Sequence, residues 1–174
     1  MLKSQDVMVS LLLAVHPQNA WSFPLIAEIT GLSPSAAFRA VQRLRASGLV
    51  VPDGFRVFEE RLVNFLEHGV PYAFAAAPGK LARGVPTAHA APPLSEHISA
   101  TNAVVWAYAK GSVRGESLTP LAPTAPEAAQ RDEALYRVLA LVDALRIGRP
   151  REQKLAMRLL KEALAHARLV TLSR

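Results

Sequence analysis

The residues of this sequence whose types and spacing could do chemistry are arginines and small polar residues in its first third. Arg39 and Arg43 are four residues apart, Arg45 follows them, and Arg56 lies in a later apolar stretch. A guanidinium donates hydrogen bonds in a planar fork that suits guanine edges and phosphate oxygens. A short side chain such as Ser35 would let the start of a helix approach a nucleic acid closely. These residue types are therefore suited to binding an anionic ligand that carries nucleobases.

A helix between Ser33 and Gly48 must position these residues. Ser33 can cap this helix with its side-chain oxygen, and Pro34 presets the backbone of the first turn. Its inner side is predicted from apolar residues at spacing i, i+4 and i+7, namely Ala37, Val41 and Leu44. The remaining arc is predicted to face outward with Ser35, Ala36, Phe38, Arg39, Gln42 and Arg43, and with Arg45 near its edge.

Each outward residue has an expected role if the ligand is DNA. Arg39 is the best candidate for reading a base in the major groove, and Arg43 and Arg45 are expected at phosphates. Arg56 would reach the backbone or the minor groove. Phe38 would either touch a thymine methyl group or pack against the neighbouring helix. The alternative is that these arginines form only a solvated helix face in a protein-binding module.

Local signals on both sides extend this helix into a larger predicted unit. Ser4 can cap a first helix that ends at His16-Pro17, and Ser22 can cap a short second helix that ends at Gly31. Gly48 stops the third helix, and the segments 49–51 and 55–58 are expected as two short strands around a Pro-Asp-Gly turn. A fourth helix is predicted over 59–68, stopped by Gly69 and Pro71.

The predicted fold class is mainly α, of the α+β type, in three parts. A DNA-binding domain with a winged helix-turn-helix is expected at 1–69, a proline-rich irregular or β module at 70–125, and a C-terminal helical hairpin with a role in dimerisation at 126–174. The hairpin is predicted as one helix from about Pro126 to Leu145, capped by Thr124, and another from Arg151 to about Arg168. No internal repeat of fixed period is found.

The middle part is expected to contain strands at 72–75 and 104–109, because aromatic residues alternate there. These aromatic residues are Tyr72, Phe74, Trp106 and Tyr108. They could line an effector pocket, and the alternative is that they are simply core residues.

The charge pattern favours an anionic partner. The net charge is +6 with a pI near 10.2, which predicts attraction to polyanions without identifying one. The C-terminal part holds a second basic group, which either binds nucleic acid or an acidic partner or is a solvated helix turn. That group consists of Arg146, Arg149, Arg151, Lys154 and Arg158.

The sequence lacks the residues that other functional classes require. The sequence contains no cysteine, which excludes disulfides, thiolate nucleophiles and cysteine zinc sites and fits a reducing compartment. There is no Gly-rich phosphate loop, no nucleophile elbow and no HExxH pair, and only His89 and His97 could approach one another in a loop. We therefore expect no enzyme, no cofactor and no metal. No apolar run reaches about 18 residues, so we expect a cytoplasmic protein without a membrane partner.

Residues 3 to 58 resemble the winged helix-turn-helix of bacterial transcription regulators of the MarR and related types, in which the segment L-A-x-x-x-G-L-S-x-S-x-x-x-R-x-V-x-R-L-x-x-x-G-L-V recurs. Here it reads Leu25-Ile26-Ala27-Glu28-Ile29-Thr30-Gly31-Leu32-Ser33-Pro34-Ser35, then Arg39, Val41, Arg43-Leu44 and Gly48-Leu49-Val50. The resemblance covers about a third of the chain. The wing is shorter than in that family, and its long dimerisation helix does not follow.

The resemblance implies a sequence-specific regulator of transcription that binds double-stranded DNA. Since one short helix reads few bases, a homodimer on two half-sites is expected. The alternative is a protein-interaction module, such as the antitoxin-like or targeting partner of an operon-encoded effector enzyme. In that case the winged helix would serve autoregulation or act only as a scaffold.

Overall fold

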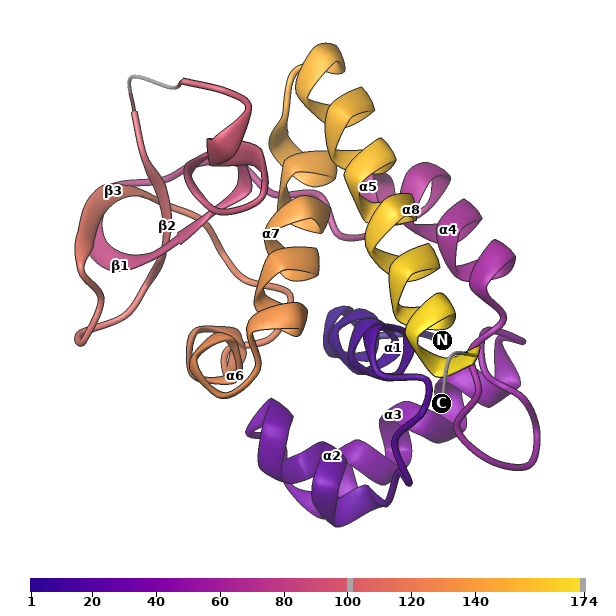
Figure 1. Ribbon diagram of the computed structural model, residues 1–174. Helices are drawn as coiled ribbons and strands as arrows, with labels where there is room; N and C mark the ends of the chain where they lie inside the picture. Colours follow the sequence, from indigo (N-terminus) through magenta and orange to yellow (C-terminus); the bar gives the residue numbers. More distant parts are fainter. Residues whose placement is uncertain (100–101, 173–174) are drawn as a thin grey trace.

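The computed structural model of the chain describes residues 1–99 and 102–172. These residues form eight α-helices and a small three-stranded sheet, so the fold is mixed α and β and mainly helical, as predicted. Figure 1 shows the sheet at one end of the molecule, beside α7, while α2 and α3 lie at the other end.

The N-terminal helices are α1 (Ser4–Val15), α2 (Phe23–Thr30) and α3 (Pro34–Ala46). The predicted caps of α2 and α3 are present, since Ser22 Oγ accepts a hydrogen bond of 3.3 Å from the backbone N–H of Leu25 and Ser33 caps α3. The predicted cap of α1 is wrong by one residue. The helix begins at Ser4 itself, and the N–H of Lys3 is satisfied by Asp6 Oδ2 at 2.8 Å.

The expected wing is a tight hairpin with very little sheet. Val50 and Val57 form an isolated β-bridge where two strands were predicted. Beside the bridge, the N–H of Val51 donates to Arg56 O at 2.9 Å. Pro52 lacks an amide hydrogen, and the left-handed Gly54 (φ 110°) turns the chain before a longer ladder can form.

Helix α4 (Glu59–His68) has the predicted bounds and buries Leu62 and Leu66. The helical conformation does not end at Gly69 and Pro71, because the short helix α5 (Val70–Ala73) follows directly. The predicted strand at 72–75 is therefore wrong. A proline fits the first turn of a helix, and the N–H of Ala73 donates to Gly69 O at 2.9 Å.

The sheet consists of β1 (Leu81–Thr87), β2 (Val104–Ala107) and β3 (Val113–Ser117), with the 3₁₀ turns η1 (Ala88–Ala90) and η2 (Leu94–Glu96) after β1. Only β2 falls in a predicted strand. β1 pairs antiparallel with β2 through residues 84–87 and with β3 through residues 81–84. β2 and β3 pair in parallel and close a small barrel.

Glycine makes this closure sterically feasible. A Cβ atom on Gly84 would lie 1.9 Å from the carbonyl oxygen of Trp106, and one on Gly115 would lie 2.4 Å from that of Ala103. The strands could not approach so closely with side chains at these positions.

The C-terminal part consists of α6 (Ala125–Arg131), α7 (Glu133–Ile147) and α8 (Pro150–Leu172). The predicted single helix at 126–145 is wrong, because it breaks at Asp132. That side chain caps α7 by accepting from the N–H of Leu135 at 2.8 Å, whereas Thr124 makes no side-chain cap bond to α6. Helices α7 and α8 form the predicted helical hairpin, and α8 is longer than expected.

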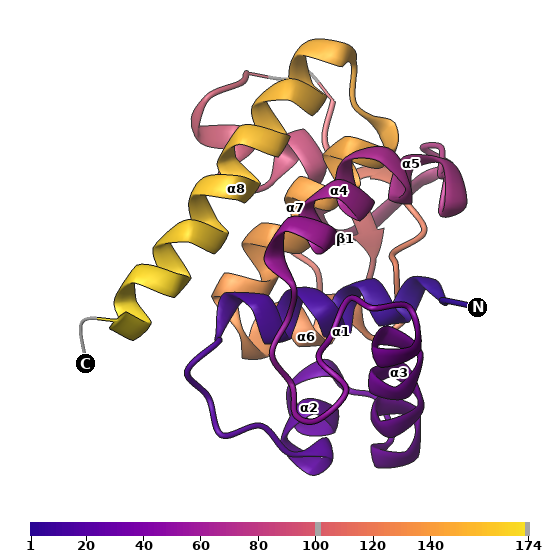
Figure 2. The ribbon, with the colours of Figure 1, turned by 90° about the vertical axis from the view of Figure 1, so that its right-hand side faces the viewer.

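The three predicted segments share one hydrophobic core. Helix α1 lies under α7 and α8 and also packs against α3 (Figure 2). The core includes Leu12 of α1, Leu44 of α3, Leu66 of α4, Trp106 of β2 and Leu160 of α8. Within residues 1–99 and 102–172, no helix has both the length and the apolar character needed to cross a membrane.

Candidate nucleic-acid interface

Helix α3 has one buried and one exposed side, as the sequence predicted. Its inner residues Ala37, Val41 and Leu44 are buried, together with Ala40. The exposed residues Ser35, Arg39 and Gln42 repeat at i, i+4 and i+7, which places them in one row along the helix. The row starts at the helix N-terminus, where the helix dipole favours anions.

The turn before α3 fixes the approach of its N-terminus. Gly31 ends α2 in a left-handed conformation (φ 72°), which favours glycine. Ser33 Oγ accepts from the N–H of Ala36 at 3.2 Å and lies 3.2 Å from Ser35 Oγ. Ser33 and Ser35 are exposed and Ala36 is half-buried, so the first turn presents small polar groups.

Arg43 does not point outward as predicted. Its Nε and Nη2 atoms donate to the two carboxylate oxygens of Asp6 at 2.7 and 2.6 Å. Asp6 is fully buried, and the Arg43 side chain is 20% exposed. The hydrogen bonds to Asp6 raise the pKa of Arg43 against the opposing effect of burial. This predicted phosphate contact therefore holds α3 against α1.

Arg45 is only partly turned to solvent. Its Nη2 donates to Gly54 O at 2.7 Å, and its guanidinium carbon lies 5.7 Å from the centre of the Phe55 ring. Arg45 thus braces the hairpin against the end of α3, while part of its guanidinium stays exposed.

Two further arginines, one in the hairpin and one in α4, lie beside the same aromatic ring. Arg56, a predicted contact, is exposed with its guanidinium 5.4 Å from the centre of the Phe58 ring. Arg61 lies 4.4 Å from the same ring and donates to Gly48 O at 2.9 Å. Arg61 was not predicted as a contact, because the apolar spacing that identifies α4 gives no information on its exposed side.

Phe38 packs against the neighbouring helix, one of its two predicted roles. Its ring meets Phe23 of α2 edge-on at 5.1 Å, and Phe23 meets Phe55 of the hairpin at 5.3 Å. This aromatic trio joins α2, α3 and the hairpin. Phe38 is still exposed, so contact with a ligand remains sterically open to it.

Helix α6 supports the other side of α2 through contacts that the sequence did not predict. Arg131 Nη1 donates to Glu28 O at 2.7 Å. Asp132 Oδ2 lies 2.7 Å from His16 Nε2, at the end of α1. Burial disfavours the Asp132 carboxylate, but the hydrogen bonds from His16 and Leu135 outweigh it and lower its pKa.

The aromatic residues proposed as an effector pocket are not gathered in one place. Trp106 is buried and meets Tyr136 of α7 at 6.0 Å between ring centres, whereas Tyr72 is 82% exposed on α5. The hydroxyl of Tyr136 donates to Pro86 O at 2.8 Å, and burial raises its pKa to about 12. For Trp106, the core alternative is the correct one.

Arg146 does not belong to the exposed basic group that was predicted near the helical hairpin. The Arg146 side chain is only 4% exposed, and it donates to Asp143 Oδ1 at 2.6 Å and to Phe74 O at 2.8 Å. Asp143 Oδ2 also accepts from Thr87 Oγ1 at 2.7 Å and from Trp106 Nε1 at 2.6 Å. Burial raises the pKa of Asp143, and these donors together with Arg146 oppose that rise.

The described residues contain no group of three or more His, Cys, Asp or Glu side chains that could hold a metal ion. His89 Nε2 instead lies 2.8 Å from Asn102 O. Models of known protein families, curated proteins and solved structures were all compared with the chain, and none of them matches it.

Proposed function

We propose that the protein is a sequence-specific transcriptional regulator that binds double-stranded DNA, with α3 in the major groove and the hairpin as a short wing on the backbone. The observation that carries this proposal is the row of Ser35, Arg39 and Gln42 on the exposed side of a capped, well-anchored helix. An α-helix fits the major groove, and these side-chain types read base edges there.

The contacts of α3 divide the proposed roles among its residues. Among the described residues, Arg39 is exposed and forms no hydrogen bond or ion pair with the rest of the protein, so its guanidinium can turn to a guanine edge. Gln42 would contact the next base, and Ser33, Ser35 and Ala36 would approach the phosphates at the helix N-terminus. Arg43, already paired with Asp6, would position α3 without touching DNA.

The hairpin is proposed to contact the backbone on the flank of the groove. Arg56 and the exposed part of Arg45 would meet phosphates there. Because both guanidiniums lie beside aromatic rings, they are held near the end of α3 before DNA arrives.

The active form is proposed to be a homodimer paired through the C-terminal helices. A groove of about 450 Å³ lies between α7 and α8, with the apolar side chains Val138, Leu141, Leu159 and Val170 among its lining. If α8 of one protomer packs against this groove of its partner, the two-fold dimer presents two α3 helices, one for each half-site.

The same groove favours a second candidate function, a protein-interaction module for an operon-encoded effector enzyme. Co-expression with the untagged product of a neighbouring gene distinguishes the two. Stoichiometric co-purification together with loss of the homodimer would favour the interaction module. A homodimer that binds DNA tightly without that product would favour the regulator.

The proposed function is tested by comparing Arg39→Ala with Arg45→Ala on DNA fragments selected from a genomic pool. Arg39→Ala should cost about 1–3 kcal/mol on the selected site and almost nothing on scrambled DNA. Arg45→Ala should weaken binding to both DNAs and reduce the salt slope by about 1. Lys161→Ala, at an exposed cation of α8 outside the C-terminal basic group, is the matched control. If Arg39→Ala and Arg45→Ala both bind like this control, the proposal is wrong.

A further inference from the structure

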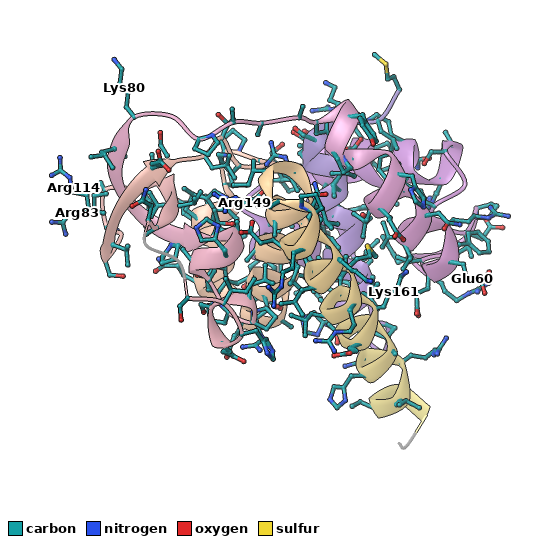
Figure 3. All side chains as sticks on the ribbon, turned by 90° about the horizontal axis from the view of Figure 1, so that it is seen from above. Glu60, Lys80, Arg83, Arg114, Arg149 and Lys161 are labelled. Carbon is teal, nitrogen blue, oxygen red and sulfur yellow. The ribbon has the colours of Figure 1, made fainter. Side chains whose placement is uncertain are left out.

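The outer surface of the barrel carries a group of four cationic side chains. Lys80, Arg83, Lys110 and Arg114 are exposed. Among the residues that the structure describes, none of the four joins an ion pair. Figure 3 shows Lys80, Arg83 and Arg114 extending into solvent from the same side of the barrel, away from the helices.

The strand register brings two of these charges face to face. Arg83 of β1 is directly opposite Arg114 of β3 in an antiparallel pair. Like charges at directly opposed positions destabilise a sheet, since their Cβ atoms are only about 5 Å apart. Glu116, two residues after Arg114 on β3 and opposite Leu81, forms no ion pair with either arginine in the described part of the chain. The opposed pair therefore gains no folding stability from a carboxylate partner.

The barrel holds both arginines outward. Each is followed in its strand by a glycine, Gly84 or Gly115, that faces the crowded interior. Since side chains alternate between the two faces of a strand, Arg83 and Arg114 must point to the outer face. The frame behind them is anchored to α7, because Thr87 and Trp106 donate to the buried Asp143.

We infer that this surface, formed by Lys80, Arg83, Lys110 and Arg114, binds the phosphate backbone of a nucleic acid. A group of exposed cations suits a ligand with many anionic groups. The cores of protein interfaces are depleted in lysine and contain aromatic or apolar anchors. In the barrel strands the large exposed apolar residue is Leu81, at 65%. The only acidic residue of these strands is Glu116.

This contact is separate from the proposed recognition helix. In both Figure 1 and Figure 2 the barrel lies in the upper part of the molecule and α2 and α3 lie in the lower part. A short duplex bound by α3 would leave the barrel surface open to a second one. The inference goes beyond the proposed function, and either can fail without the other.

The test uses the full chain, a fluorescein-labelled 12-base-pair duplex of arbitrary sequence, and anisotropy titrations between 50 and 200 mM NaCl. The variant R83S/R114S removes the opposed pair, and K161S/R168S, which removes two exposed cations of α8 outside the C-terminal basic group, is the matched control. Wild type should bind one duplex per chain more than R83S/R114S does, whether or not α3 binds a duplex as well. The variant should also lose roughly tenfold in affinity at 50 mM NaCl and about 2 units of salt slope.

A charge-conserving variant, R83K/R114K, should bind like wild type and guards against loss of the fold. The inference is overturned if R83S/R114S and K161S/R168S have the same stoichiometry and salt slope. It is also overturned if R83S/R114S binds the duplex normally and loses binding only to a polyglutamate peptide, which would make the surface a protein-docking site. Arg39→Ala on selected DNA reports separately on the proposed function.

Discussion

Each end of this molecule is fixed by one buried aspartate, and each of these aspartates pairs with an arginine. Asp6 of α1 accepts two parallel hydrogen bonds from Arg43 of α3 and thereby fixes the proposed recognition helix. Asp143 of α7 accepts from Arg146 one turn later in its own helix. Asp143 also accepts from Thr87 and Trp106, and so fixes the barrel.

The comparison shows that an arginine's place in a helix does not decide whether it serves a ligand or the fold. Arg39 and Arg43 are one turn apart on α3, yet only Arg43 meets a buried carboxylate. At the other end, Arg146 belongs to a basic stretch, yet its charge is used inside the protein while Arg149 and Arg151 remain exposed.

The largest expected effect comes from breaking the barrel's anchor with Asp143→Ala. This change leaves the buried donors of Arg146, Thr87 and Trp106 without their acceptor, and we expect it to lower the free energy of unfolding by about 4 kcal/mol. Urea unfolding followed by circular dichroism measures the loss. Thr87→Val, which removes only one donor, is the milder control. An Asp143→Ala protein within 1 kcal/mol of wild type would show that the barrel does not depend on this carboxylate.

Arg43→Met should have the next largest effect, about 3 kcal/mol, because it leaves the buried Asp6 carboxylate without its partner. The loss is smaller than for Asp143 because water can reach the site past a side chain that is 20% exposed. The double variant Asp6→Leu/Arg43→Met should recover most of the stability in a double-mutant cycle. If Arg43→Met is as stable as wild type but binds DNA weakly, Arg43 is a phosphate contact after all.

The smallest effect is expected at a third carboxylate, Asp132, which is less buried than the other two. Its pKa is lowered in the folded protein, so its contribution is present above the unfolded value near 4 and is lost as the pH falls below that value. Asp132→Asn keeps a good helix cap and removes the charge. We expect it to cost about 1 kcal/mol at pH 7, and the difference from wild type should shrink below pH 4. A difference that stays constant from pH 7 to pH 3 would contradict this assignment.

The sequence predicted those parts of the fold whose signals are local. Ser22, Ser33, Gly31 and Gly48 act at the helix ends where they occur, and the spacing of Ala37, Val41 and Leu44 identified the inner side of α3. The strands β1 and β3 were not predicted, because their pairing depends on glycines that allow close approach between distant segments. Pro86 also interrupts the strand pattern of β1.

In the candidate site, too, the local features were predicted and the contacts between distant residues were not. The exposed placement of Ser35, Arg39 and Gln42 followed from helical periodicity alone. Arg43 and Asp6 are 37 positions apart in the sequence, and no local sequence pattern predicts that they pair. The break at Asp132 was missed for a different reason, because a capping aspartate inside an apolar repeat resembles an ordinary exposed helix residue until its partners are seen.

The most direct measurement of the central claim is selection of bound DNA from a random pool at physiological salt, carried out in parallel with wild type and Arg39→Ala. Wild type should enrich a palindrome with half-sites about one helical turn apart. Arg39→Ala should lose the preference at one base pair in each half-site while its fold is unchanged. Enrichment of no sequence by wild type, or of the same sequence by both proteins, would contradict the claim that α3 reads DNA through Arg39.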